Sequence, residues 1–262
     1  MTSNASIRRW EPYAWPLCAA AVLLCVWQAV VAGSGTRVFP SPLAVERGLA
    51  ELVHKGLLWR YIPDSLFRVS VGYILAILCG IPLGLLLGWY PSAAAAGNPV
   101  IQMLRPISPL AWIPLAIVWF GAGNLASIFL IFLASVFPIV VSTINGVRNI
   151  PPMFVQAGQN FGLSPVRLLG RVIFPAVLPQ MLVGLRIALG VAWLVLVAAE
   201  MVAATSGLGY LIIDSRNAGQ RYDLVVAGML LIGLIGLGLD FGIRRLENRK
   251  SVRWGFRRGA SQ

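Results

Sequence analysis

Three ionisable side chains lie inside long apolar runs of this sequence: Arg105, Arg186 and Glu200. An ionised group near the centre of a bilayer costs roughly 2.5–3.5 kcal/mol on insertion scales, so such groups usually face a protein interior or water. Two arginines at one depth attract an anion, and each can hold a sulfonate or carboxylate through two N–H groups. We therefore predict that they line the path of an anionic solute. Further candidates for this path are Gln102, Ser108 and Trp112.

The positions of these charges in their runs leave two interpretations open. Arg105 lies twelve residues beyond Ala93, about 18 Å along a helix, and Arg186 lies at a similar depth. Glu200 follows Arg186 by fourteen residues, or about 21 Å, so the two cannot pair along one helix. Either the arginines line a path, with Glu200 as a gate or docking residue, or all three are paired structurally.

The sequence offers no catalytic or metal-binding constellation. There is one histidine, His54, and the three cysteines at 18, 25 and 79 lie in apolar runs without metal-type spacing, where we interpret them as packing residues. No Walker loop, GxSxG or HExxH is present. The glycines of 84–88 and 233–238 lie in apolar runs, where small residues let helices approach closely. We therefore predict neither an enzyme nor a cofactor or metal in this chain.

Composition indicates an all-α integral membrane protein. Of the 262 residues, 58% are hydrophobic and 11% charged, whereas soluble domains carry about 25% charged residues. A membrane-spanning helix needs about 20 apolar residues. The sequence predicts one transmembrane domain, 1–262, with six spans, at about 14–32, 65–89, 93–121, 124–146, 175–204 and 224–243.

The third span is expected to be broken. Pro106, Pro109 and Pro114 fall within nine residues of it, and proline inside a helix removes a backbone hydrogen bond. Irregular backbone at membrane depth is tolerated only inside protein or beside a water-filled cavity.

Basic residues predict the orientation. The tail 244–262 and the segment 147–174 are rich in arginine, and Arg8 and Arg9 precede the first span. Because cytoplasmic loops collect Lys and Arg, we expect both termini and 147–174 in the cytoplasm. The loop 33–63 is the exception, since it carries four basic residues yet lies outside in this topology.

The N-terminus also resembles a secretory signal, because Arg8 and Arg9 precede the apolar run 17–32. That run is long enough to span, and Trp10, Tyr13 and Trp15 resemble an interfacial aromatic belt. Both features favour an uncleaved first helix.

The outer loop 33–63 contains a predicted amphipathic helix. Ser41 and Pro42 form a helix start, and apolar residues then recur at helical spacing. The helix could lie on the outer membrane face, or the segment could be a plain covering loop.

The segment 147–174 interrupts the apolar runs with polar residues. It is predicted to form two short helices that meet at Gly162, a residue that can end a helix in the left-handed conformation. Leu163 bridges the turn, and Ser164 with Pro165 begins the second helix. Such a hairpin cannot bury its apolar side alone, so we expect a partner groove.

This segment resembles the signature loop of binding-protein-dependent ABC importer permeases, which reads Glu-Ala-Ala, three residues, Gly, nine residues, Ile, with Pro nearby. Here it reads Gln156-Ala157-Gly158, then Gly162, then Val172-Ile173 and Pro175. Gln156 replaces the usual Glu without its charge, and Gly158 replaces Ala, which weakens a helix by up to about 1 kcal/mol. The resemblance covers about 60–246, and the stretches 104–121, 184–201 and 206–212 are similar to the nitrate, sulfonate, taurine and bicarbonate branch.

The resemblance implies a type I importer permease in the cell inner membrane. It implies a second permease copy, an ATPase dimer that binds ATP and Mg²⁺, and an outer binding protein that delivers the solute, with no role for nucleic acid. The coupling residues that it implies are Gln156, Ala157, Gly158, Gly162, Leu163, Ser164, Arg167 and Pro175. Aliphatic sulfonates or taurine are the expected solutes, with nitrate or bicarbonate as alternatives.

Two other classes of function stay open at this stage. One is a membrane-embedded enzyme or scaffold whose hairpin recruits a soluble partner, and the lack of paired intramembrane carboxylates argues against chemistry there. The other is a secondary transporter that needs no ATPase and uses an ion gradient. Co-purification with a Walker-containing ATPase distinguishes the importer from both.

Overall fold

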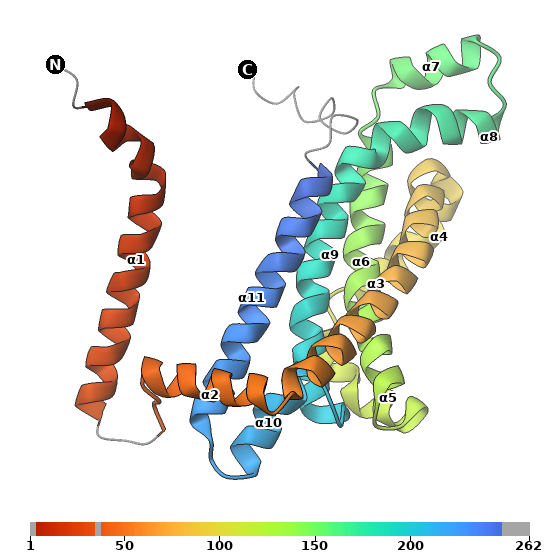
Figure 1. Cartoon of the computed structure of the whole chain (residues 1–262). Helices are drawn as coiled ribbons and strands as arrows, with labels where there is room; N and C mark the ends of the chain where they lie inside the picture. Colours follow the sequence, from red (N-terminus) through yellow and green to blue (C-terminus); the bar gives the residue numbers. More distant parts are fainter. Residues whose placement is uncertain (1–3, 35–37, 248–262) are drawn as a thin grey trace. The chain divides into compact units, whose positions relative to one another are not determined.

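The computed structural model describes residues 4–34 and 38–247, and within those ranges the regular structure is entirely helical (Figure 1). By their internal contacts the residues fall into two compact units, Met1–Trp59 with Leu211–Leu231 and Arg60–Tyr210 with Ile232–Gln262. The α-helices are α1 (Asn4–Ser34), α2 (Pro42–His54), α3 (Leu57–Trp89), α4 (Pro91–Leu104), α5 (Ile113–Phe120), α6 (Asn124–Arg148), α7 (Pro152–Asn160), α8 (Pro165–Leu168), α9 (Phe174–Ala203), α10 (Leu208–Asn217) and α11 (Tyr222–Glu247). A short 3₁₀ helix, η1, spans Pro109–Trp112, and a π-helical turn, η2, spans Leu169–Ile173.

Four helical segments of the described chain are long and apolar enough to cross a membrane: Leu57–Trp89, Asn124–Arg148, Pro165–Ala203 and Tyr222–Arg245. The pair Pro91–Leu104 and Pro109–Phe120 makes a fifth span if it is counted as one. The predicted first span corresponds to a shorter apolar stretch of α1, Cys18–Gly33. Four of the six predicted spans are thus confirmed as single helices, the third is bent, and the first stays a prediction.

The predicted break of the third span is confirmed. α4 ends at Leu104, η1 begins at Pro109, and the helices on either side meet at 82°. Ser108 caps η1, because its Oγ accepts a hydrogen bond from the N–H of Leu110 at 3.3 Å. Gly121, with φ 75°, ends α5 in a conformation that glycine adopts readily.

Glycines on one face of α3 bring it close to α6. A Cβ added at Gly84 would lie 2.5 Å from Thr143 Cβ, and one added at Gly88 would lie 2.7 Å from Val147 Cβ. Gly80 and Gly72 meet α6 in the same way, one and three turns earlier in α3. The expectation that the glycines of 84–88 serve close helix packing is therefore confirmed. Of the run 233–238, only Gly236 makes such a contact, with the indole of Trp193.

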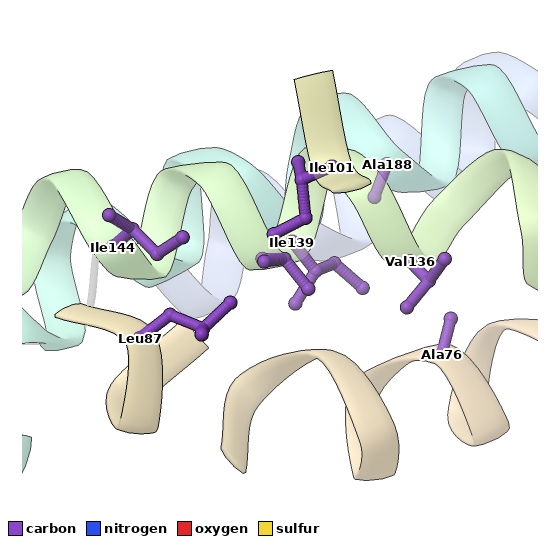
Figure 2. Packing of buried hydrophobic residues seen from close by; sticks show 8 residues of the cluster. Ala76, Leu87, Ile101, Val136, Ile139, Ile144 and Ala188 are labelled. Carbon is purple, nitrogen blue, oxygen red and sulfur yellow. The ribbon is translucent and has the colours of Figure 1, made fainter. Parts of the chain in front are cut away.

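In the unit formed by Arg60–Tyr210 with Ile232–Gln262, an apolar core lies where α3, α4, α6 and α9 meet. Figure 2 shows Ala76 and Leu87 of α3, Ile101 of α4 and Ala188 of α9 around the α6 side chains Val136, Ile139 and Ile144. All are at most 8% exposed. Apolar packing of this kind, with small residues at the closest approaches, holds membrane helices together because lipid supplies no hydrophobic drive between them.

The predicted outer helix is present as α2. Ser41 caps it through the N–H of Ala44 at 3.2 Å, and Pro42 occupies its first turn. Val45 and Leu52 are buried, whereas Val53 is exposed.

An exposed ion-pair cluster joins α2 to the start of α11. Arg221 Nη2 lies 2.5 Å from Glu51 Oε2 and 2.8 Å from Asp223 Oδ2, and Lys55 Nζ lies 2.6 Å from Glu51 Oε1. Hydrogen bonds from Arg221 and Lys55 lower the pKa of Glu51 to about 2.

The three cysteines are free and exposed on helices, not packed as the sequence led us to expect.

Candidate functional site

The turn at Gly162 is built from a complete set of helix-terminating hydrogen bonds. Gly162 has φ 71°, its N–H donates to the carbonyl of Gln159 at 2.9 Å, and the N–H of Leu163 donates to the carbonyl of Gly158 at 3.1 Å. These two bonds define a Schellman motif, which satisfies the last carbonyls of α7. The left-handed conformation expected for Gly162 is confirmed.

Gly158 lies where the two arms of the hairpin touch. It is buried, and a Cβ at this position would lie 2.5 Å from Leu168 Cδ1 and 3.3 Å from Val172 Cγ2. The small residue allows this close approach, which is a physical reason for glycine where the family pattern has alanine. Gln156 and Ala157, by contrast, are exposed on α7.

The second arm of the hairpin is continuous with the fifth span. α8, the π-helical turn η2 and α9 form one helical segment, Pro165–Ala203, instead of a separate short helix. Pro175 stands in the first turn of α9 and has no N–H to donate, so the preceding turn widens to the π form. The second arm of the hairpin is therefore joined to α9 without a break.

One part of the apolar side of the hairpin is buried against the rest of the chain, and another part is exposed. Leu168 and Ile173 are buried with Val147, Val177 and Met181, so part of the face predicted to need a partner is covered within the chain. Three other large apolar side chains of the hairpin are strongly exposed, Phe161 at 86%, Val166 at 80% and Met153 at 66%. Ser164 and Arg167 are also exposed, whereas Leu163 is half-buried.

The break in the third span presents the predicted polar residues on its surface. Arg105 follows directly after α4, and its side chain forms no ion pair with any residue that the structure describes. Gln102 and Ser108 are exposed on either side of it, and Trp112 is half-buried. The structure does not bring Arg105 into the same cluster as Arg186.

Arg186 of α9 is paired with an acid that the sequence argument did not consider. Its Nε donates to Asp240 Oδ1 of α11 at 2.7 Å and its Nη2 to Oδ2 at 3.4 Å. Arg244 Nε donates to the same Oδ2 at 2.8 Å. Both Arg186 and Asp240 are about one third exposed, at 34% and 33% of their side chains. Asp240 therefore lies between two arginines, Arg186 and Arg244, at the surface of this chain.

Glu200, at the other end of α9, is sealed. Its side chain is fully buried, and it accepts hydrogen bonds from Arg68 Nη1 at 2.6 Å, from Ser65 Oγ at 2.8 Å and from the N–H of Gly209 at 2.9 Å. Arg68, 3% exposed, also binds Asn124 Oδ1, Ser206 O and Ser206 Oγ. Every polar atom of this pair is satisfied, which is what a buried ion pair requires.

The segment 206–209 lies directly against this pair, and its glycines explain how. Gly207 has φ 109°, and a Cβ there would collide with the Glu200 carboxylate and lie 2.6 Å from Arg68 Nη1. Gly209 leaves the same kind of space, because its Cβ would meet the carbonyl of Val197 and lie 2.8 Å from Glu200 Cβ. The pair thus anchors the segment between α9 and α10.

Arg68 and Asp240 were not among the site residues predicted from the sequence, although both lie within the predicted spans. The rule that charges inside a membrane find partners would have pointed to them. Arg68 is four residues into the second span and Glu200 four residues from the end of the fifth, so the antiparallel topology places them at one level.

Helices of membrane-spanning length, a sharply bent helix pair and a helical hairpin continuous with a span are features of an integral membrane protein. The chain belongs to the family of binding-protein-dependent transport system inner membrane components, whose sequence profile matches residues 80–252. Its members are permease subunits of ABC importers, in which ATP hydrolysis resides in a separate subunit.

Two relatives and one solved structure show where the chain stands within this family. The taurine transport system permease protein TauC of Escherichia coli is 38% identical over 87% of this chain and 86% of its own length. The nitrate import permease protein NrtB of Synechocystis is 36% identical over 89% and 87%. The chain belongs to the branch that contains these proteins and the bicarbonate permeases. In fold it matches the inward-facing MetNI methionine ABC transporter, with a TM-score of 0.64 and 20% identity over 72% of this chain and 94% of that one.

Proposed function

We propose that two copies of this chain form the path of an ATP-driven importer for a small anion. An ATPase dimer would bind the hairpin at 147–174 from the cytoplasm, and an outer binding protein would deliver the solute. The observation that carries this proposal is the hairpin itself, whose tip exposes apolar side chains and whose second arm is the start of α9.

Coupling follows from the continuity of that helix. A motor that closes on Phe161 and Val166 would move α8, and α9 would move with it because η2 joins them without a break. The tip must keep its shape for this, and the Schellman motif at Gly162 holds it. Gln156 is exposed and can donate and accept hydrogen bonds to the ATPase without a charge.

Cations near α9 and at the break support an anionic solute. Arg105 has no acidic partner among the described residues, and Arg186 and Arg244 both donate to Asp240. The named relatives transport taurine and nitrate. We therefore infer that this chain carries an aliphatic sulfonate or taurine, or else nitrate or bicarbonate, and that the binding protein makes the choice.

The coupling role is tested by Gly162→Val in the complex reconstituted with its ATPase and binding protein. Valine is strained at φ 71° and should distort the tip, so ATP-driven uptake should fall at least tenfold while the chain still inserts and assembles. Gly233→Val on α11 is the matched control, because open space surrounds that glycine and its backbone is helical. Uptake that survives in Gly162→Val would remove the coupling role.

The solute is identified in the same vesicles. Stimulation of ATPase activity should be measured with sulfonate, taurine, nitrate and bicarbonate, each with the binding protein present. Stimulation by none of the four would contradict the anion importer, whereas stimulation by one names the substrate.

A further inference from the structure

A cavity of about 540 Å³ lies along one side of α9, and Arg186 and Asp240 are part of its lining. The rest of its lining is apolar and forms a helical stripe. The stripe is made of Val183, Ile187, Gly190 and Leu194. The volume is within the range of about 300–1,000 Å³ that is usual for small-molecule sites. Gly190 contributes to this space, because a Cβ there would touch nothing within 4 Å.

Asp240, the counter-ion of Arg186, has a second arginine beside it. Asp240 accepts one short hydrogen bond from Arg186 Nε, at 2.7 Å, and one long hydrogen bond from Nη2, at 3.4 Å. The same carboxylate is held by Arg244 at 2.8 Å. If Asp240 lost its contact with Arg186, it would still have a cation beside it, so the exchange would leave no carboxylate unpaired.

A small oxyanion fits the place that Asp240 occupies. Nitrate, bicarbonate and a sulfonate head present oxygens in a spacing close to that of a carboxylate, which the guanidinium fork binds through two N–H groups. Replacing Asp240 by such an anion exchanges one charge-assisted contact for another. The one-third exposure of both partners gives an anion in the cavity access to them.

We propose that Arg186 is an anion-binding residue of the transport path, that Asp240 is its resident counter-ion, and that Arg244 holds Asp240 while the solute takes its place. The ligand class is a small singly charged oxyanion, with the apolar stripe accommodating the carbon chain of a sulfonate. This inference rests on the proposed import of an anion and adds the site at which the permease itself holds it.

The site is tested by thiol labelling of Gly190→Cys in a chain whose native cysteines are replaced, purified with its ATPase in lipid vesicles. Two reagents of similar size are compared, the anionic 2-sulfonatoethyl and the cationic 2-(trimethylammonio)ethyl methanethiosulfonates. The labelling rate of the anionic reagent divided by that of the cationic reagent should rise roughly three- to tenfold in Asp240→Asn. The same ratio should fall by a similar factor in Arg186→Gln, because each change shifts the local charge by one unit. Leu194→Cys, 72% exposed in the same stripe, serves if Gly190→Cys does not assemble.

Anion binding is read from protection in the same preparation. Taurine, ethanesulfonate, nitrate or bicarbonate should slow labelling in the parent, slow it at lower concentration in Asp240→Asn, and not slow it in Arg186→Gln. Val202→Cys, exposed on α9 sixteen residues from Arg186, should respond to none of these changes. A rate ratio that Arg186→Gln leaves unchanged, or the absence of protection by all four anions, would overturn the site.

A merely structural pair and a failure of the proposed function are both distinguishable. In the double variant Arg186→Gln/Asp240→Asn the charges are removed together, so a structural pair would give uptake near the parent level, whereas an anion site predicts a loss of at least tenfold. If the unmodified complex itself imports none of the four anions, the importer proposal fails. If it imports one and the double variant does so equally well, only the present inference fails.

Discussion

Helix α9 carries two ion pairs fourteen residues apart, and they differ in how deeply the protein buries them. Arg68–Glu200 is 3% and 0% exposed, and each of its polar groups has a protein partner. Arg186–Asp240 is about one third exposed on both sides, has one long hydrogen bond, and lies beside a cavity. The same chemistry, an arginine and a carboxylate, therefore occurs in two very different surroundings on one helix.

The difference teaches which pair can take part in transport. Removing one member of a sealed pair leaves a buried charge without compensation, so the sealed pair must stay intact and acts as a structural anchor of the segment 206–209. A pair that is partly exposed on the protein surface can exchange partners without leaving a charge sealed in the protein. Of the two acids, Asp240 is the one that an anion can displace, although only Glu200 attracted attention in the sequence.

The largest expected effect is that of Glu200→Ala. Arg68 would lose its carboxylate while staying 3% exposed, and the cost of a broken buried pair is about 3–5 kcal/mol. Asp240→Ala is the matched variant, with a smaller expected cost because Arg186 is not sealed inside the protein. The measurement is the thermal midpoint of each chain purified in detergent, together with the amount inserted in the membrane. Equal losses in the two variants would abolish the distinction between the pairs.

A second prediction concerns the glycine that covers the sealed pair. Gly207→Ala places a Cβ against the Glu200 carboxylate at φ 109°, a conformation that alanine adopts only with strain. The loss should be about 2 kcal/mol or more, read from the same thermal midpoint. Gly233→Ala on α11 has open space and helical backbone, so it should be neutral or stabilise slightly. If Gly207→Ala proved as stable as Gly233→Ala, the close cover over Glu200 would be wrong.

The smallest effect is expected at the exposed pair Glu51–Arg221. The folded pKa of Glu51 is lowered to about 2 from its ordinary 4.5, so its contribution to stability is present above about pH 4.5 and is lost as the pH falls towards 2. Glu51→Gln should therefore be slightly less stable than the parent at pH 7, with a gap that closes on acidification. Glu46→Gln, exposed on the same helix, is the matched control for the loss of a surface carboxylate. A gap that widens towards low pH would contradict the sign of this linkage.

Much of the fold could be predicted from residue types along the chain. Helices 65–89, 124–146, 175–204 and 224–243 were predicted to within a few residues, except that α3 begins earlier, at Leu57. Proline spacing predicted the break of the third span, and the glycine at 162 predicted the turn. These features are local, because a backbone hydrogen bond, a fixed φ and an apolar run of given length depend on neighbours in sequence.

The candidate site was less predictable. Arg186 and Glu200 were identified as unusual, but their partners Asp240 and Arg68 lie 54 and 132 residues away in the chain. The packing role of Gly158 could not be predicted, because it depends on contact with the second arm of the hairpin. Helix propensity alone says only that glycine lowers the stability of the helix there. The continuity of α8 with α9 was not predicted, because Pro165 and Pro175 both indicate helix starts. The π-helical turn before Pro175 lets the helix continue through that proline without a break.

By itself the sequence determined that this chain is helical, belongs in a membrane, bends at its third span and carries a turn at Gly162, because these follow from composition and local backbone chemistry. Only the tertiary structure decided which charged residues form ion pairs and which of these pairs are buried. Burial and pairing depend on helices brought together from distant parts of the chain, and the spacing of residues along the sequence does not give their separation in space.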